Sequence, residues 1–173
     1  MDGAGPRLVG MAETRSDPGL QGDDLRTWVA LATVMEWLPV ALDEQLQRTA
    51  GLSHFEYGVL FALSQAPEGR LRMSVLAGYA NSSLSRLSRA VTRLERQGWV
   101  RREADPADGR STLTVLTPEG RARYDLATPG HADTVQRLVL APLTRAQQRQ
   151  LREVAGRIAA AVRDEPGWTP PVA

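Results

Sequence analysis

The sequence predicts a mainly α-helical protein in which helices at both ends of the chain flank a central segment of shorter helices and one β-hairpin. Two apolar stripes of helical period, within residues 25–46 and 151–162, predict the flanking helices. Alternating residues between positions 99 and 116 predict the hairpin. The 173 residues, of which 42% are hydrophobic, suffice for a core of ordinary size.

Residues 1–22 are expected to form a disordered arm, because they are rich in glycine and proline and lack periodicity. A first long helix is expected over residues 23–50. Its apolar positions recur every three or four residues: Leu25, Trp28, Ala32, Met35, Pro39, Leu42 and Leu46. A weaker stripe that includes Trp37 lies on the opposite side, so this helix must be covered on two faces, centrally in the fold or at a subunit interface. Pro39 should kink it.

Residues 51–117 have the element order of a winged helix-turn-helix, in which two helices are followed by a hairpin. Local capping and turn residues define the expected elements. The first is a helix that the capping box of Ser53 and Glu56 opens and that ends before Pro67. A short strand at 71–73 and a short helix capped by Ser74, ending near Tyr79, follow it. A helix then runs from the turn at residues 81–83 to Gln97, where Gly98 closes it, and strands are expected at 99–103 and 112–116. The polar segment 104–111 predicts a long hairpin tip.

Further helices are expected over residues 118–163. Thr117 and Pro118 open the first of them, which Pro129-Gly130 should kink or split. A second capping box at residues 144–147 opens the last helix, and residues 164–173 should be a loose tail.

Composition excludes several kinds of site. The absence of cysteine excludes disulfides, thiolate metal sites and thiol catalysis. The two histidines lie far apart in the sequence and no carboxylate spacing completes a metal site, so neither a metal nor another cofactor is expected. No apolar run approaches the length of a membrane span and no export signal is recognisable, so we expect a cytoplasmic protein without membrane contact.

Charge is unevenly distributed along the chain, although the net charge is only +1. Residues 1–69 carry 4 Arg against 10 acidic residues, whereas residues 70–123 carry 11 Arg against 5. A compact basic segment of this kind is typical of a nucleic-acid-binding unit. A basic surface without a partner remains the alternative. GC-rich coding is the favoured explanation for the complete absence of lysine.

The helix that follows residue 83 has one apolar and one basic face. On a helical wheel Leu84, Leu87, Val91 and Leu94 form the face expected to be buried. The opposite side carries the candidate DNA contacts of this helix and its start: Ser82, Ser83, Ser85, Arg86, Arg89, Arg93 and Arg96. Serine permits close backbone approach to the major groove, and arginine can form a forked pair with guanine. An ordinary helix with a solvated arginine face is the alternative.

The hairpin tip supplies a second candidate contact. Asp108 precedes Arg110 by two residues and could hold its guanidinium by a charge-assisted hydrogen bond, aiming it outward. An arginine on a narrow loop fits the negative potential of the DNA minor groove. A simple turn with a surface ion pair is the alternative.

Three runs of residues together resemble the MarR family of bacterial transcriptional regulators over roughly residues 24–163. They are Leu71–Ala77, Ser82–Glu95 and the wing Asp105–Arg110 with the following Leu116–Gly120. The wing is the most specific part, because it matches the family pattern Asp-x-Arg followed by Leu-Thr-x-x-Gly.

The resemblance implies a homodimer whose first and last helices pack together, with two winged lobes on a pseudopalindromic operator in double-stranded DNA. It implies that Arg110 enters the minor groove while the helix from Ser82 or Ser83 reads the major groove. Pro39 and Pro129-Gly130 depart from the expected helices and leave the geometry between the dimer helices and the DNA lobes open.

Many members of that family bind a small, often aromatic or anionic effector between the dimer helices and the DNA lobe. The candidate wall residues here are Trp28, Trp37, His54, Tyr57 and His131. Four of them have a structural alternative: Trp28 in the core, Trp37 at the dimer contact, His54 as part of a helix N-terminus and His131 in solvent.

The expected function is therefore that of a sequence-specific DNA-binding transcriptional regulator, a repressor that a small ligand could release. A non-specific DNA-associated protein without ligand control is the alternative. An enzyme is poorly supported, because no phosphate-binding glycine loop, nucleophile elbow or zinc motif is present. A purely protein-binding helical module would leave the basic hairpin unexplained.

Overall fold

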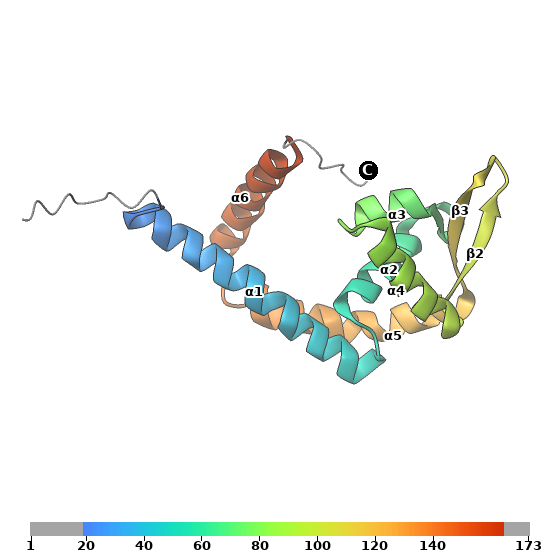
Figure 1. Cartoon of the computed structure of the whole chain (residues 1–173). Coiled ribbons are helices and arrows are strands. Elements are labelled where there is room, and N and C mark those ends of the chain that lie inside the picture. Colours follow the sequence, from blue (N-terminus) through green and yellow to red (C-terminus); the bar gives the residue numbers. More distant parts are fainter. Residues whose placement is uncertain (1–18, 165–173) are drawn as a thin grey trace, which may run out of the picture. The chain divides into compact units, whose positions relative to one another are not determined.

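The computed structural model describes residues 19–164 of the chain. Its internal contacts divide the chain into two compact units, residues 1–36 and 37–173. Most of the expected arm and tail, at residues 1–18 and 165–173, lies outside the described residues. Figure 1 labels most of the helices and strands.

Helix α1 (Gly22–Ala50) begins with two acidic residues in its first turn and ends before Gly51, close to the expected bounds. Pro39 lies inside this helix and does not end it. Among the described residues of the first unit, α1 exposes Leu25, Trp28, Val29, Val34 and Met35. By length and composition alone α1 could span a membrane, because an 18-residue window within it has a mean hydropathy of 1.2. This finding is contrary to the expectation that no such segment exists.

The second unit contains a winged helix-turn-helix. The elements are α2 (His54–Gln65), a 3₁₀ turn η1 (Pro67–Gly69), β1 (Arg70–Arg72), α3 (Met73–Tyr79), α4 (Leu84–Arg96), β2 (Val100–Asp105) and β3 (Asp108–Leu116). The three strands form one antiparallel sheet in the order β1-β3-β2, so β1 pairs with the second strand of the hairpin.

Local signals set most helix ends as predicted. Ser53 and Glu56 form the expected capping box at α2, and Gly98 follows α4 with a positive φ of 74°. The prediction that Ser74 caps α3 is wrong, because α3 begins at Met73 with Arg72 at the N-cap and no side-chain cap. Strand β1 pairs with β3 up to Arg72 and leads directly into α3, so Ser74 lies within the first helical turn and lacks the extended backbone of an N-cap residue.

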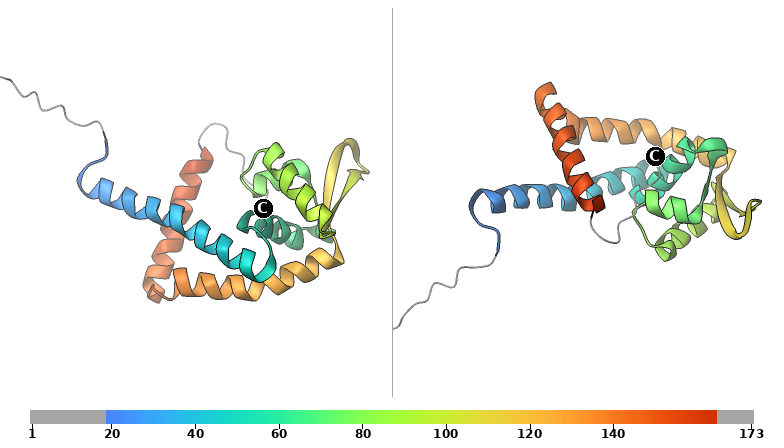
Figure 2. Two further views of the ribbon diagram at one scale, coloured as in Figure 1. Left: turned by 60° about the horizontal axis from the view of Figure 1, so that its bottom comes forward. Right: turned by 90° about the horizontal axis from the view of Figure 1, so that it is seen from above.

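The hairpin has a tight tip instead of the expected long one. Strand β2 ends at Asp105 and β3 begins at Asp108, which leaves two residues between them. The Asp105 carboxylate accepts the Ala107 N–H at 2.9 Å, so a side chain stabilises the polar tip that composition alone assigned to an open loop. The two views in Figure 2 show the hairpin as a narrow ribbon projecting beyond α4.

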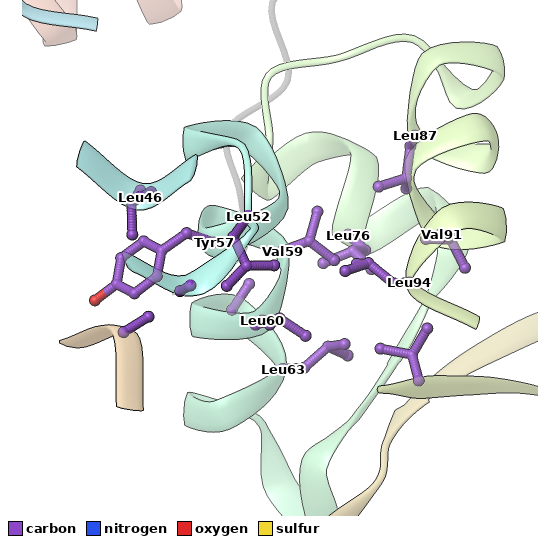
Figure 3. Close-up of a cluster of buried hydrophobic side chains, with 14 of the residues drawn as sticks. Leu46, Leu52, Tyr57, Val59, Leu60, Leu63, Leu76, Leu87, Val91 and Leu94 are labelled. Carbon is purple, nitrogen blue, oxygen red and sulfur yellow. The ribbon is translucent and has the colours of Figure 1, made fainter. Parts of the chain in front are cut away.

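The core of the second unit joins α2, α3 and α4 to the end of α1 and to the sheet. Its fully buried side chains come from every one of these elements (Figure 3). Leu46, Leu52, Leu60, Leu63, Leu76, Leu87, Val91 and Leu94 are each at most 1% exposed. This packing fixes the orientation of α4 relative to α2.

Helix α5 (Pro118–Val135) runs through Pro129 without a break, so neither proline splits its helix. Ala127 and Thr134 of α5, on either side of Pro129, are buried, and α5 packs against α2. The irregular point comes later, in the π-helical turn η2 (Gln136–Leu140) that precedes α6 (Arg145–Asp164). The expected capping interactions between Thr144 and Gln147 are present at the start of α6.

Candidate nucleic-acid interface

Helix α4 presents a basic face to solvent. Ser83 is its N-cap and accepts the Arg86 N–H at 3.3 Å. Leu87, Ala90, Val91 and Leu94 form the buried face. Leu84 is 55% exposed, so its assignment to that face is wrong: it stands in the first turn, beyond the reach of the core.

The arginines on α4 differ in what holds them. Arg93 donates from Nε to Glu56 Oε1 at 2.8 Å, which ties α4 to the capping box of α2. The Arg86 guanidinium lies 4.6 Å from the centroid of the Phe55 ring. Within residues 19–164, Arg89 and Arg96 form no ion pair or side-chain hydrogen bond, so their donors are available to a partner.

The serines at the start of α4 form a small hydroxyl cluster. Ser83 and Ser85 Oγ lie 3.1 Å apart, and Ser82 donates to the Ser83 carbonyl. All three belong to the turn and first turn of the helix, so the structure brings them together with Arg86 and Arg89 on one element.

At the wing, Asp108 does not hold the guanidinium of Arg110, contrary to the prediction. Its carboxylate accepts the backbone N–H of Arg110 at 3.1 Å and the Ser111 hydroxyl at 2.8 Å. The Ser111 hydrogen bond, followed by the Arg110 N–H, lowers the pKa of the Asp108 carboxyl. Asp108 therefore orders the start of β3, while the Arg110 side chain stays exposed with no ion-pair partner in the described part of the chain.

A second carboxylate anchors the base of the tip. Arg72 of β1 donates from Nε to Asp105 Oδ2 at 2.6 Å, and the Asp105 side chain is buried. The Ala107 N–H and then the Arg72 guanidinium lower the pKa of the Asp105 carboxyl. This pair joins the outer strand to the wing that carries Arg110.

Sequence reasoning missed Arg102, the residue that joins the wing to α4. Its guanidinium pairs with Glu95 and donates to the Ser88 carbonyl and Thr92 Oγ1, both at 3.0 Å. Its backbone N–H also donates to Glu95 Oε1 at 3.0 Å. The sequence feature that could have indicated this role is Glu95, the single acidic residue beside the basic face, because Glu95 forms the ion pair with Arg102.

Three of the five predicted effector-site residues lie together between α2 and α5. The His131 and Tyr57 ring centroids are 4.4 Å apart, and those of His131 and His54 are 5.7 Å apart. Burial, with a smaller contribution from His54, lowers the pKa of the His131 imidazole. Burial likewise raises the pKa of the Tyr57 phenol, whose oxygen lies 3.3 Å from Thr128 Oγ1. His131 is half-buried in this stack and not in open solvent.

Trp37 makes no ring contact with this cluster in the part of the chain that the structure describes. Trp37 is 76% exposed and lines none of the described cavities, and Trp28 belongs to the first unit, where it is 49% exposed. A cavity of about 660 Å³ does open beside His54, between α2, the second half of α1 and the turn before α4.

The chain resembles a DNA-bound protein of known structure over nearly its whole length. That protein is Sco3205, a MarR family transcriptional regulator from Streptomyces coelicolor, crystallised in complex with DNA; its sequence is 40% identical to this chain. The match covers 88% of this chain and 98% of that one, with a TM-score of 0.82.

More distant relatives match as well. The repressor YetL from Bacillus subtilis is 33% identical over 81 residues, which cover 47% of this chain and 48% of YetL, so the chain spans about half the length of this curated relative. CouR from Rhodococcus jostii RHA1, whose crystal structure is bound to p-coumaroyl-CoA, is 27% identical in sequence. The match covers 79% of this chain and 92% of CouR, with a TM-score of 0.65.

The sequence pattern of the MarR family matches residues 50–111, which contain the helix-turn-helix and most of the wing. Together with the 40% identity that extends across both flanking helices, this match agrees with the resemblance carried by the wing motif. The family consists of transcriptional regulators and not of enzymes. The chain belongs to the MarR family.

Proposed function

We propose that this chain is a cytoplasmic, sequence-specific transcriptional repressor that binds a pseudopalindromic operator as a homodimer. In this proposal α4 enters the major groove and Arg110 of the wing enters the minor groove. The observation that carries it is the exposed basic face of α4, on which Arg89 and Arg96 have no partner within residues 19–164. Such unpaired guanidinium groups are the donors that base edges and phosphates accept.

The contacts divide into two kinds. Arg89, near the middle of the exposed face, is the proposed base contact, with Ser82, Ser83 and Ser85 allowing the helix start to approach the duplex. Arg93 and Arg86 are already engaged with Glu56 and Phe55, so they contribute mainly position and positive charge. Asp108 supports Arg110 indirectly, through the backbone of the tip.

Dimerisation is favoured by apolar surface that the single chain leaves uncovered. On α6, the side chains of Leu151, Val154, Ile158 and Val162 are between 43% and 52% exposed at helical spacing. A second copy would bury this stripe and also the apolar surface of α1, which is why we assign α1 to a subunit interface and not to a membrane. Two lobes held in this way would address half-sites roughly 34–36 Å apart.

The experiment is selection of bound duplexes from a random DNA pool, followed by gel-shift titration of wild type and variants on the selected operator. Arg89→Ala should weaken operator binding by about 1–3 kcal/mol and relax the preference for its base pair. Arg110→Ala should weaken binding by at least about 1.4 kcal/mol, or tenfold, with the fold retained. Arg26→Ala removes an equal charge from an exposed pair with Asp23 and should leave affinity unchanged.

Equal affinity for selected and random duplexes would instead favour the non-specific DNA-associated protein. A monomer at micromolar concentration in sedimentation, or recovery of the chain in the membrane fraction, would contradict the dimer and the cytoplasmic assignment. The regulatory part of the proposal is release of DNA by a small molecule in the cavity beside His54. Its test is loss of the gel shift on addition of that molecule.

A further inference from the structure

The cavity beside α4 is lined by aromatic side chains and by carboxylates. Its volume is about 660 Å³, enough for an organic molecule of moderate size. Phe55 and Phe61 of α2 and Tyr79 of α3 supply rings, and Phe61 is 48% exposed. All of its lining residues belong to the second unit of the chain.

Two acidic residues, Asp43 and Glu44, stand side by side on the α1 wall of this cavity. Neither forms an ion pair with any residue between 19 and 164. Asp43 Oδ1 accepts the His54 N–H at 2.8 Å, which fixes this carboxylate at the N-terminus of α2. The ionisable side chains that line the cavity are therefore two carboxylates, one guanidinium (Arg86) and one imidazole (His54), and the two carboxylates attract a cation.

The ring face of Phe55 already holds a cation that belongs to the protein. The Arg86 guanidinium lies 4.6 Å from the ring centroid and lines the same cavity. A positive group over the face of an aromatic ring is attracted by the ring quadrupole. Since Arg86 also belongs to the exposed side of α4, one residue connects the cavity wall with the proposed DNA-binding face.

We propose that this cavity binds an apolar organic cation, such as an arylalkylammonium ion, and that the ligand competes with Arg86 for Phe55. The positive group of the ligand lies toward Asp43 and Glu44, and its apolar body lies against the exposed rings. This ligand class follows from the carboxylates of this chain; it differs from the acyl-CoA bound by CouR.

The regulatory consequence rests on the proposed function. Arg86 displaced from Phe55 loses its fixed position and must be ordered again when DNA binds, which costs side-chain entropy. The cation therefore weakens operator binding, and the coupling disappears when Arg86 is removed.

The test uses two fluorescent probes with the same aromatic body and opposite charge, 1-naphthylmethylammonium and 1-naphthoate. Binding to the full chain is measured by fluorescence titration without DNA. The cation should bind at least about tenfold more tightly than the anion. In the double variant Asp43→Asn/Glu44→Gln, the new amide at the first position keeps an oxygen for the His54 N–H, and the affinity for the cation should fall by a similar factor.

Glu36→Gln is the matched control, because Glu36 is an exposed carboxylate of α1 that does not line the cavity, and it should leave probe binding unchanged. Arg86→Ala should bind the cation more tightly than wild type, since the ring face is vacated. Tighter binding of the naphthoate, or equal binding of the cation by the double variant and wild type, would overturn the proposal.

Gel shifts with the selected operator separate this inference from the proposed function. The cation should weaken operator binding by wild type about fivefold or more and leave binding by Arg86→Ala unaffected. If wild type binds the operator specifically and the cation does not change that affinity, the proposed effect of the cation on DNA binding is refuted, while the proposed function stands. Absence of specific binding in the probe-free wild type would instead overturn the proposed function.

Discussion

Replacing Arg102 with methionine should loosen the wing from α4 and lower the free energy of unfolding by about 2 kcal/mol. Methionine keeps the unbranched stem but removes the donors to the Ser88 carbonyl and Thr92 Oγ1. Each of these hydrogen bonds contributes about 1 kcal/mol. The Glu95 ion pair adds less than about 1 kcal/mol, because both side chains are about one-quarter to one-third exposed.

The groups left behind keep other partners, which limits the loss. Glu95 Oε1 still accepts the backbone N–H of residue 102, and the Thr92 hydroxyl still donates to the Ser88 carbonyl at 2.8 Å. The matched control is Arg101→Met, the preceding residue of β2, whose guanidinium is 53% exposed and pairs with Glu103. It should cost less than about 0.5 kcal/mol.

The assay is urea unfolding of wild type and both variants at one protein concentration, since association shifts apparent stability. Gel shifts on the selected operator provide a second measurement, in which Arg102→Met should lose more affinity than Arg101→Met although the charge change is equal. Two variants of equal stability and equal operator affinity would refute the role of Arg102 in fixing the wing.

Two further predictions concern the support of the site. Gly120→Ala should destabilise the protein by more than about 3 kcal/mol in thermal or urea unfolding, because its Cβ would lie 1.9 Å from the Trp99 carbonyl oxygen. The control Gly58→Ala, which has open space at its Cβ, should be neutral or slightly stabilising. Similar losses of stability in both variants would refute this prediction. Because burial lowers the pKa of His131 below its ordinary value of 6.5, the unfolded state binds the proton more readily, so stability is complete above pH 6.5 and falls as the pH drops below it. His131→Phe should flatten this slope below pH 6.5, and an unchanged slope there would assign the pH dependence to other groups.

Short-range signals predicted the parts of the fold that depend on neighbouring residues. Ser53 and Glu56, Gly98 and Thr117 set helix ends as expected, since capping involves backbone groups within one turn. The same holds for the basic face of α4, whose position follows from helical period. The wing motif identified the family because its residues lie close together in the sequence.

Signals that depend on distant partners failed or were absent. Asp108 was expected to hold the Arg110 guanidinium, but the tight tip brings backbone N–H and Ser111 to it instead. The link from Arg102 to α4 crosses from a strand to a helix, and no local spacing predicts it. Leu84 has the right period for the buried face but lies beyond the end of the core.

The sequence by itself determined where most helices begin and end, which face of α4 is basic and which family the chain belongs to, because each depends on residues within a few turns of one another. Only the tertiary structure decided which arginines remain available. Glu56 lies on a different helix from Arg93, and Phe55 is 31 positions from Arg86. Whether a guanidinium is held or unpaired depends on which side chains the packed core brings within reach of it, and that distance is fixed by packing between elements.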